Sequence, residues 1–551
     1  MTPVRFRWTS SIFGAGVKNA KNGFYQIAEN WDGRYGIPGT EEVADLTGIA
    51  ATFRVIKMLK HADTDIVIAT DGTTTRVYRK ETTWVSKVDQ LDGGASSEDA
   101  IVGVATDAVS FKNVLAIALG GSAAYVYTTA TTATGRTWGF VTSTKTAAGN
   151  PDRANKFLVQ NNGVLEPRVT YGVSPNEIYY TTDLTNTDGT GVLPTYIGDS
   201  ASTMNAINSI AEDNAGRVVI GMRRGLWTVD EEGVLERLTE EEFDDPRLDA
   251  TGQSDRDNFE LCVKLGGKLW YNVEGYDWGW WDGQQRKFNR YCAPRHGNPL
   301  LKPEDRMVMP RADLPINAAT KAGGWLILFL GSKSTATIKD VTLYPGGGSH
   351  LASTFTTASE MWVGLPYGEG VIWHGVQLLC TNPLRYAWWD EDDSYLYMAS
   401  GDSESANLQM TRCLFFTDHP LHRLTSSAVV LTEATEKIEF GALDFGEPWE
   451  YKHPKAITLD TLGLAATAPA WEVEYQVAPD YESTAFESDF VTFDDNHDAE
   501  VGAEFDTGEP NRAMHLRLVG TAGTNLYPIL KGFEVVAEMD STRHKQLPRH
   551  R

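Results

Sequence analysis

The chain has 551 residues, 41% of them hydrophobic and 11% aromatic, a composition typical of a globular protein rather than a disordered one. No apolar run approaches the roughly 20 residues needed to cross a bilayer. The opening MTPVRFRWTSS also lacks the apolar core of a signal peptide, so we expect a soluble protein without a membrane span. The formal charge of −25 argues against nucleic-acid binding by base readout, which relies on clustered Lys and Arg.

Residues 1–50 contain many turn residues and one or two short candidate strands, in FYQIAENWDGRYGIPGTEEVADLTG. Two interpretations stay open for this segment. It is either an arm that docks on a neighbouring molecule or a strand that closes the repeated unit that follows it.

Residues 51–435 repeat one pattern, in which an apolar strand and one or two turn residues precede a strand that carries an aromatic residue. Periods of roughly 40 to 50 residues with only strands predict a β-propeller, with one four-stranded blade per period. Seven landmarks about 45 to 63 residues apart therefore predict about seven blades. The landmarks are Ile68, Ile117, Gly172, Ile220, Leu265, Leu328 and Leu378.

The stretch from Asn258 to Gly283 carries the most aromatic copy of the pattern, NFELCVKLGGKLWYNVEGYDWGWWDG. Two apolar runs meet at Gly266 and Gly267, which predicts a β-hairpin with a glycine turn, and a third run ends at Trp281. We interpret its tryptophans as packing residues between blades. The alternative is a platform on which sugar rings stack, formed by Trp280-Trp281 and Trp388-Trp389.

The longest interruption of the repeat lies between Arg286 and Lys321 and is rich in Pro and basic residues. A long loop without periodicity in a compact domain is usually functional or an interface element. The one helix-like candidate in the chain, TEEEFDDPRLDATG, is short.

Residues 436–540 change in character, because apolar and polar residues alternate in KAITLDTLGL, AWEVEYQVAP, DFVTFD, MHLRLVGT and ILKGFEVVAEM. This alternation predicts a C-terminal antiparallel β-sandwich, similar to a jelly roll. Between Ile438 and Asp540 there are 21 Asp or Glu against 5 Lys or Arg. Residues 541–551 form a basic tail, so this region is either suited to a charged neighbour or simply a solvated surface.

Candidate chemical motifs favour structure over catalysis. TTATGRTW resembles the turn motif of sialidases, but Ala133 stands where the Asp belongs. The run from Asp390 to Asp393 could bind Ca²⁺ but lies where a hairpin turn is expected, and we interpret it as a solvated turn. The cysteines match no zinc pattern and are expected to be free thiols. They are Cys262, Cys292, Cys380 and Cys413.

The sequence contains no nucleophile elbow, Walker loop or His-Glu-x-x-His motif. We therefore predict a protein that is not an enzyme, with no catalytic, cofactor-binding or metal-binding residues and no cofactor.

The repeat and the strands MHLRLVGT and PILKGFEVVAEM resemble tail proteins of tailed bacteriophages, the propeller-bearing nozzle, hub or minor tail components. The lead-in GFYQIAENWDGRYGIPGTEEV resembles their opening. The resemblance implies a virion tail subunit that is assembled in the host bacterial cytoplasm. It also implies a ring-shaped homo-oligomer that contacts other phage tail proteins and presents loops to a host surface glycan or receptor. The alternative is a glycan-binding or glycan-hydrolysing propeller.

Overall fold

The computed structural model describes a defined part of the chain, to which all structural statements below refer. These residues are 2–9, 25–29, 31–32, 37–38, 43–44, 48–89, 100–119, 125–131, 138–143, 146–147, 150–151, 154–161, 164, 166–173, 177–185, 191–193, 207–222, 225–230, 234–239, 259–273, 277–283, 292, 316–330, 359–380, 384–400, 410–415, 435–443, 445, 451–462, 470–478, 501–504, 513–521 and 529–539. They form strands and turns but no helix. Within them, accordingly, no helix is long and apolar enough to span a membrane.

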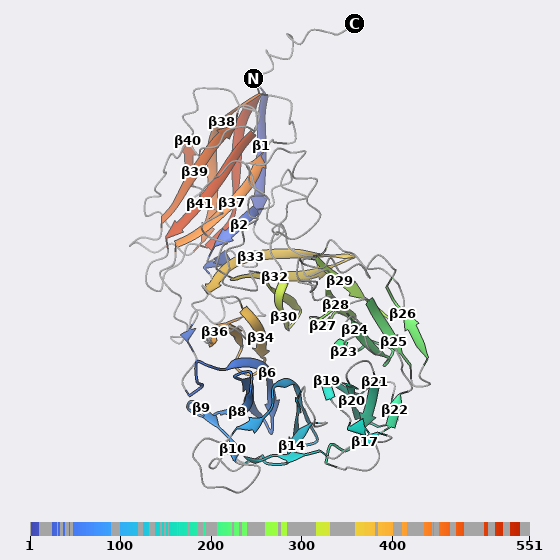
Figure 1. Cartoon of the computed structure of the whole chain (residues 1–551). Helices are drawn as coiled ribbons and strands as arrows, with labels where there is room; N and C mark the ends of the chain where they lie inside the picture. Colours follow the sequence, from blue (N-terminus) through green and yellow to red (C-terminus); the bar gives the residue numbers. More distant parts are fainter. Residues whose placement is uncertain are drawn as a thin grey trace, which may run out of the picture.

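Seven antiparallel sheets surround a common centre and form a seven-bladed β-propeller (Figure 1). The first blade contains β6 (Arg54–His61), β7 (Thr64–Thr70), β8 (Thr74–Lys80), β9 (Trp84–Ser86) and β11 (Ile101–Val102); the second contains β12 (Ala105–Phe111), β13 (Val114–Leu119), β14 (Val126–Thr128) and β16 (Val141–Thr142). The third contains β19 (Ala154–Gln160), β20 (Arg168–Val173), β21 (Glu177–Thr181) and β22 (Gly191–Leu193); the fourth contains β23 (Ile207–Glu212), β24 (Val218–Met222), β25 (Gly225–Val229) and β26 (Leu235–Arg237); the fifth contains β27 (Cys262–Leu265), β28 (Lys268–Val273) and β29 (Asp277–Trp281). The sixth contains β30 (Ile316–Ala322), β31 (Trp325–Leu330), β32 (Ser359–Tyr367) and β33 (Gly370–Cys380); the seventh contains β34 (Leu384–Asp390), β35 (Tyr395–Ser400), β36 (Met410–Leu414) and β5 (Val43–Ala44).

The second strands of the blades explain why the repeat is visible in the sequence. All six residues of β13 and all five of β24 are buried, as are the last five of β31. Neighbouring blades cover both faces of such a strand, so it reads as a continuous apolar run instead of an alternating one.

Two of the seven landmarks fall on other strands than the pattern implied, although the predicted blade number is confirmed. Leu265 ends β27, the inner strand of the fifth blade, and Leu378 lies in β33, the outer strand of the sixth. The stretch from Gly375 to Asp390 therefore belongs to two blades, because β33 pairs with β32 and β34 pairs with β35. The apolar outer strand β33 and the polar turn after it have the same sequence pattern as a second strand and its turn.

The hairpin around Gly266 and Gly267 is confirmed, since β27, β28 and β29 form one antiparallel sheet. Both glycines have positive φ, 61° and 74°, as a tight two-residue turn between strands requires. The interruption predicted to reach Lys321 is shorter than expected, because β30 begins at Ile316. Residues 293–315 of that loop and the helix-like TEEEFDDPRLDATG beyond Thr239 lie outside the described residues.

The last blade is completed from the other end of the chain. β5 pairs with β36, Thr411 facing Ala44 and Arg412 facing Val43, which is the pairing expected of a closing strand. Short pairs of strands accompany the blades. They are β3 (Trp31–Asp32) with β4 (Ile37–Pro38), β10 (Val88–Asp89) with β15 (Trp138–Gly139), and β17 (Thr146–Ala147) with β18 (Asn150–Pro151).

Two further four-stranded sheets lie beside β32 and β33, above the propeller in Figure 1. One has the order β1 (Thr2–Thr9), β42 (Ile529–Met539), β38 (Lys452–Leu462) and β40 (Val501–Glu504). The other has the order β2 (Tyr25–Glu29), β37 (Thr435–Leu443), β41 (Ala513–Thr521) and β39 (Ala470–Ala478). Four of the predicted C-terminal strands are thus present, and DFVTFD lies outside the described residues.

Hydrophobic burial joins these sheets to the propeller. One cluster of buried residues includes Trp270 of the fifth blade, Trp362 of the sixth, and Ile457, Leu516 and Phe533 of the two C-terminal sheets. β2 also lies against β33. The two parts of the chain therefore share a core where they meet.

Candidate functional site in the central channel

The inner strand of each blade begins in the same way. In six of the seven inner strands described, a β-bulge shifts the register near the start of the strand. The residue before each bulge is apolar and buried, which anchors the strand between blades. These residues are Val55, Ala105, Ala154, Ile207, Ile316 and Leu384. A bulge re-aims the side chains that follow it, here toward the axis of the propeller.

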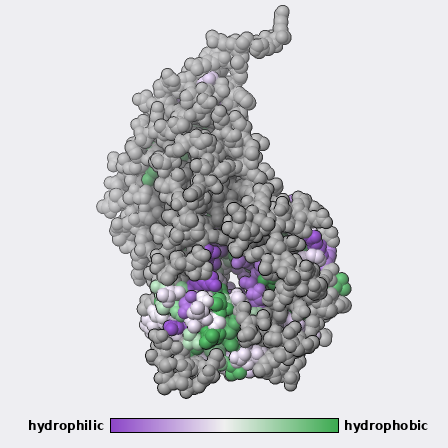
Figure 2. All heavy atoms as spheres, in the orientation of Figure 1, coloured by the Kyte–Doolittle hydropathy of each residue, from purple (hydrophilic) through white to green (hydrophobic). Residues whose placement is uncertain are grey.

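The side chains that follow these anchors line a cavity of about 400 Å³ at the centre of the propeller, which we call the central cavity. Residues in or just before all seven inner strands contribute to its wall. Hydrophilic residues gather around the hollow in the middle of the propeller (Figure 2). The sequence did not single out this site, although the short pattern of an apolar residue followed by polar ones recurs in RVIK, ATD, ANK and INS.

An ion pair crosses from the first blade to the second at the wall of the central cavity. Lys57 Nζ lies 2.9 Å from Asp107 Oδ1, and the Asp107 side chain is 9% exposed. The backbone N–H groups of Phe157 and Ala108 also donate to this carboxylate, at 2.8 and 2.9 Å. Burial disfavours the charged carboxylate, but Lys57 and Lys156 keep the pKa of Asp107 below its ordinary value. Asp107 in turn raises the pKa of Lys57, so both groups carry their charge.

Tyr386 continues this arrangement across the seam between the last blade and the first. Its hydroxyl accepts a hydrogen bond from the Met58 backbone N–H at 2.9 Å and lies 3.2 Å from the Met58 carbonyl oxygen, to which it donates. Burial raises the pKa of Tyr386, so the phenol stays neutral and keeps its proton for the carbonyl. Tyr386 therefore both lines the cavity and links the last blade of the propeller to the first.

The wall of the cavity offers little for nucleophilic chemistry. Burial raises the pKa of Cys262 to about 12, which keeps this thiol protonated. The Ser209 hydroxyl donates to the Phe259 carbonyl oxygen. Two carboxylates, Asp107 and Glu260, are the acidic residues among those that line it. The arrangement is suited to holding a ligand by charge and hydrogen bonds.

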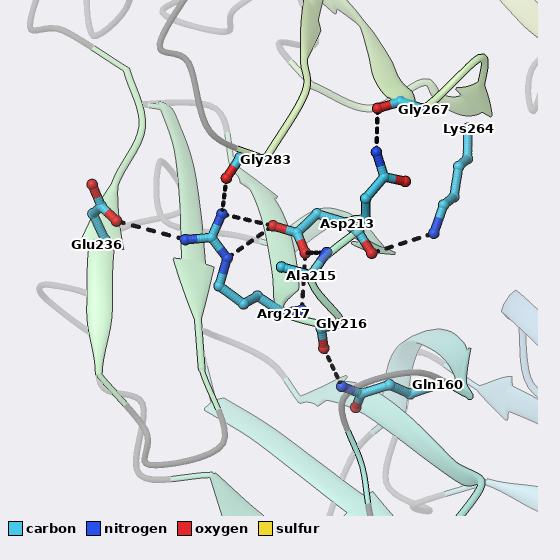
Figure 3. Close-up of polar contacts among 10 residues, drawn as sticks. Gln160, Asp213, Ala215, Gly216, Arg217, Glu236, Lys264, Gly267 and Gly283 are labelled. Atoms are coloured by element: carbon cyan, nitrogen blue, oxygen red, sulfur yellow. Dashed lines mark hydrogen bonds and ion pairs between the residues drawn. The ribbon is translucent and has the colours of Figure 1, made fainter.

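At the opposite end of the inner strands, buried polar groups fasten the blades together (Figure 3). Asp213 is 1% exposed and shapes the turn after β23, because its Oδ1 accepts from the backbone N–H groups of Ala215 and Arg217 at 2.9 and 3.0 Å. Its Oδ2 accepts from the Arg217 guanidinium at 2.9 Å. Arg217 also donates to the Gly283 carbonyl oxygen of the fifth blade at 2.6 Å.

This turn is held from both neighbouring blades. Gln160 of the third blade donates to the Gly216 carbonyl oxygen at 2.7 Å. Lys264 of the fifth blade donates to the Asp213 carbonyl oxygen at 3.3 Å. In the opposite direction, Asn214 of the turn donates to the Gly267 carbonyl oxygen of the fifth blade. Blades three, four and five are thus joined by hydrogen bonds as well as by apolar packing.

The acidic run from Asp390 to Asp393 was predicted to form a turn. It connects β34 to β35, and the turn is confirmed. Lys60 of the first blade lies 2.9 Å from Asp390, which is buried, and also pairs with the exposed Asp392. The Lys60 ammonium group therefore supplies the positive charge next to these carboxylates, where a bound Ca²⁺ would have supplied it. No group of three or more metal-ligating side chains occurs in the described part of the chain.

The aromatic residues proposed for sugar stacking are mostly inside the protein. Trp280 and Trp281 are each 3% exposed, and the Trp280 indole N–H donates to the Glu369 carbonyl oxygen at 2.9 Å. Trp388 is half-buried, with its ring centroid 5.7 Å from that of Tyr397. These contacts fit the interpretation of the tryptophans as packing residues between strands and blades.

Cys262, Cys292 and Cys413 are not in disulfides, as predicted. The side chain of Cys380 lies outside the described part of the chain. The basic tail at 541–551 lies outside the described residues.

Comparisons with known proteins found similarity only to solved structures. No family model and no curated protein matches its sequence. Among solved structures, the extracellular domain of a putative hybrid two-component system from B. thetaiotaomicron is 9% identical over 72% of this chain, with a TM-score of 0.42. This chain covers 44% of that protein. A Myceliophteria thermophila β-propeller domain, Cps50, is 11% identical over 67% of this chain and 99% of its own length, with a TM-score of 0.39.

Proposed function

We propose that this chain is a non-enzymatic structural subunit of a bacteriophage tail, as a nozzle, hub or minor tail component. In this proposal, copies of the chain assemble as a symmetric ring within the virion and contact other tail proteins. The resemblance of its lead-in and C-terminal strands to phage tail proteins supports the proposal, together with a rigid two-part architecture suited to repetition around an axis.

The observation that carries the proposal is the path of the N-terminal segment. Within the first 44 residues, β1 pairs with β42, β2 pairs with β37, and β5 pairs with β36. One segment is thereby built into both C-terminal sheets and into the last blade. A subunit that transmits force along a tail needs its parts fixed to one another, and strand pairing at three places provides such fixation.

In the same proposal, the two C-terminal sheets face each other as an antiparallel β-sandwich. Alternate residues of β42, among them Phe533, Val535 and Ala537, are buried, as are Leu516 and Leu518 of β41. Burial of one face in each sheet is what a sandwich requires. The many acidic residues of 436–540 and the basic residues of 541–551 would then meet complementary charges on neighbouring subunits.

Native mass spectrometry of the purified full-length chain and imaging of phage particles test this function. The expected result is a closed homo-oligomer in solution or on assembly, and density for the propeller around the axis of the tail. A stable monomer that is absent from particles would contradict the proposal.

A further inference from the structure

The central cavity carries a charge opposite to that of the protein as a whole. Four of its lining residues are cationic and two are acidic, whereas the whole chain has a formal charge of −25. The cations are Arg54, Lys57, Lys156 and Arg385, and the acids are Asp107 and Glu260. A cleft lined by one sign of charge raises the local concentration of the opposite ion.

One of the two carboxylates in the wall, Asp107, is engaged in an ion pair and in backbone hydrogen bonds. Asp107 pairs with Lys57 at 2.9 Å and accepts two backbone hydrogen bonds, so little of its acceptor capacity remains for other cations. Lys156, a half-buried residue of the third blade, is also attracted to this carboxylate. With Lys57 and Asp107 counted as a neutral pair, the lining has three further cationic residues, Arg54, Lys156 and Arg385, and one further acidic residue, Glu260.

Arg54 adds a second, independent observation. Its Nε, at the start of the inner strand of the first blade, is buried without a hydrogen-bond acceptor among the described residues. A buried donor of this kind loses its hydrogen bonds to water, a loss that an acceptor would restore. Guanidinium groups present several N–H donors in a plane, which fits the oxygen atoms of phosphate and carboxylate groups.

We propose that the central cavity binds a small multivalent oxyanion, held by Arg54 and Lys156 and drawn in by the positive potential of the wall. A volume of about 400 Å³ suits a small molecule and is too small for a folded partner. Lys57 and Asp107 are not ligands in this assignment. They keep the wall in place across the first two blades. The inference does not depend on the ring assembly or on the phage origin proposed above.

Isothermal titration calorimetry on the full-length chain tests the proposal, with pyrophosphate and citrate as separate probes at low, matched ionic strength. At least one probe is expected to bind the unmodified protein and to raise its melting temperature. The probe that binds more tightly identifies the ligand as phosphate-bearing or carboxylate-bearing. Affinity is expected to fall as NaCl is added, because salt screens the attraction.

Lys156→Gln and Arg54→Gln are each expected to weaken binding about tenfold, the loss of one hydrogen bond to a charged group. Lys156→Arg, which keeps the charge, is expected to retain binding and covers the case in which Arg54→Gln does not fold. The matched control is Lys112→Gln, at the other end of β12 and about 16 Å along the strand from the cavity. Lys112 is exposed and is expected to leave affinity within about twofold.

Two results would overturn the assignment. One is the absence of binding heat and thermal stabilisation with both probes. The other is an equal loss of affinity in Lys112→Gln and Lys156→Gln, which would mean that the anion binds to charge in general and not in the central cavity.

Discussion

Asp65 is a carboxylate whose surroundings disfavour its charge. Burial raises the pKa of this residue from 3.8 to about 6, and the negative charges of Asp390 and Asp393 across the seam between the last and first blades act in the same direction. Lys60 opposes them. Near neutral pH the folded protein therefore holds an ionised group in a place that favours the protonated form.

The Asp65→Asn variant is expected to melt at a higher temperature than the unmodified protein at pH 8. The folded pKa lies above the unfolded value, so the stabilisation from the protonated form is present below pH 3.8 and is lost as the pH rises through about 6. The gain from Asn should therefore be large at pH 8, smaller at pH 5 and absent only well below pH 3.8. Thermal melting followed by circular dichroism across this range measures it.

Asp63→Asn is the control, because Asp63 is exposed in the turn between the same two strands. A gain for Asp65→Asn that does not vary with pH, or an equal gain for Asp63→Asn, would rule out titration of Asp65 as the cause.

Single residues of the central cavity could not be predicted from the sequence. Lys57 and Asp107 lie 2.9 Å apart but belong to different blades, and no local signal links them. The bulges decide which residue faces the axis, and a one-residue shift turns a side chain to the other face of a strand. Free thiols and buried tryptophans were predictable, because residue type and apolar surroundings are enough for that.

Gly48 shows how closely the closing strand is fitted to the first blade. It lies between β5 and β6, with φ at +103°, and a Cβ atom there would be 1.8 Å from the Trp84 carbonyl oxygen. Gly72, in the turn between β7 and β8, also has positive φ, +92°, but a Cβ atom there would meet no atom within 4 Å.

Gly48→Ala is expected to lower the melting temperature several times more than Gly72→Ala. Both changes carry the cost of a left-handed backbone, roughly 1–2 kcal/mol. Gly48→Ala alone forces the backbone of Trp84 to move. Hydrogen exchange should then show faster opening of β36, the partner of β5, in Gly48→Ala only. Equal effects of the two variants would mean that this contact does not hold the closing strand.

At the level of elements, strands were more predictable than their partners. Runs that are buried at all or all but one of their positions, such as VLAIAL and WLILFL, marked second strands, because two neighbouring blades cover them. β33 is also apolar in sequence, but it contacts β2 and contributes Trp373 to the core shared with the C-terminal sheets, a placement that the sequence does not reveal. For this reason the sequence pattern wrongly predicts Leu378 as the landmark of the seventh blade.

On the scale of the whole molecule, Trp373 of β33 lies in the core shared by the propeller and the C-terminal sheets. It is 4% exposed, and its indole N–H donates to the Cys292 carbonyl oxygen at 2.7 Å. Removing it should weaken the attachment between the two parts more than it weakens either part.

Trp373→Ala is expected to cost about 3–5 kcal/mol, the usual loss for a large aromatic in a core. Differential scanning calorimetry should show one transition for the unmodified chain and two for the variant. Trp388→Ala, which removes a half-buried ring from the seventh blade, is the control and should lower the transition without splitting it. One unsplit transition in Trp373→Ala would mean that strand pairing alone holds the parts together.

The order of synthesis gives the N-terminal strands a further consequence. β5 must wait for β36, and β1 must wait for β42 at the other end of the chain. At about 5–20 residues per second, the ribosome takes roughly 20 to 70 seconds to reach β36 after it has made β5. During that time the first strands have no partner, and their unpaired edges are open to other nascent chains. We therefore expect the propeller to close no earlier than the synthesis of β36, and expression yield to depend on chaperones that shield the N-terminal segment.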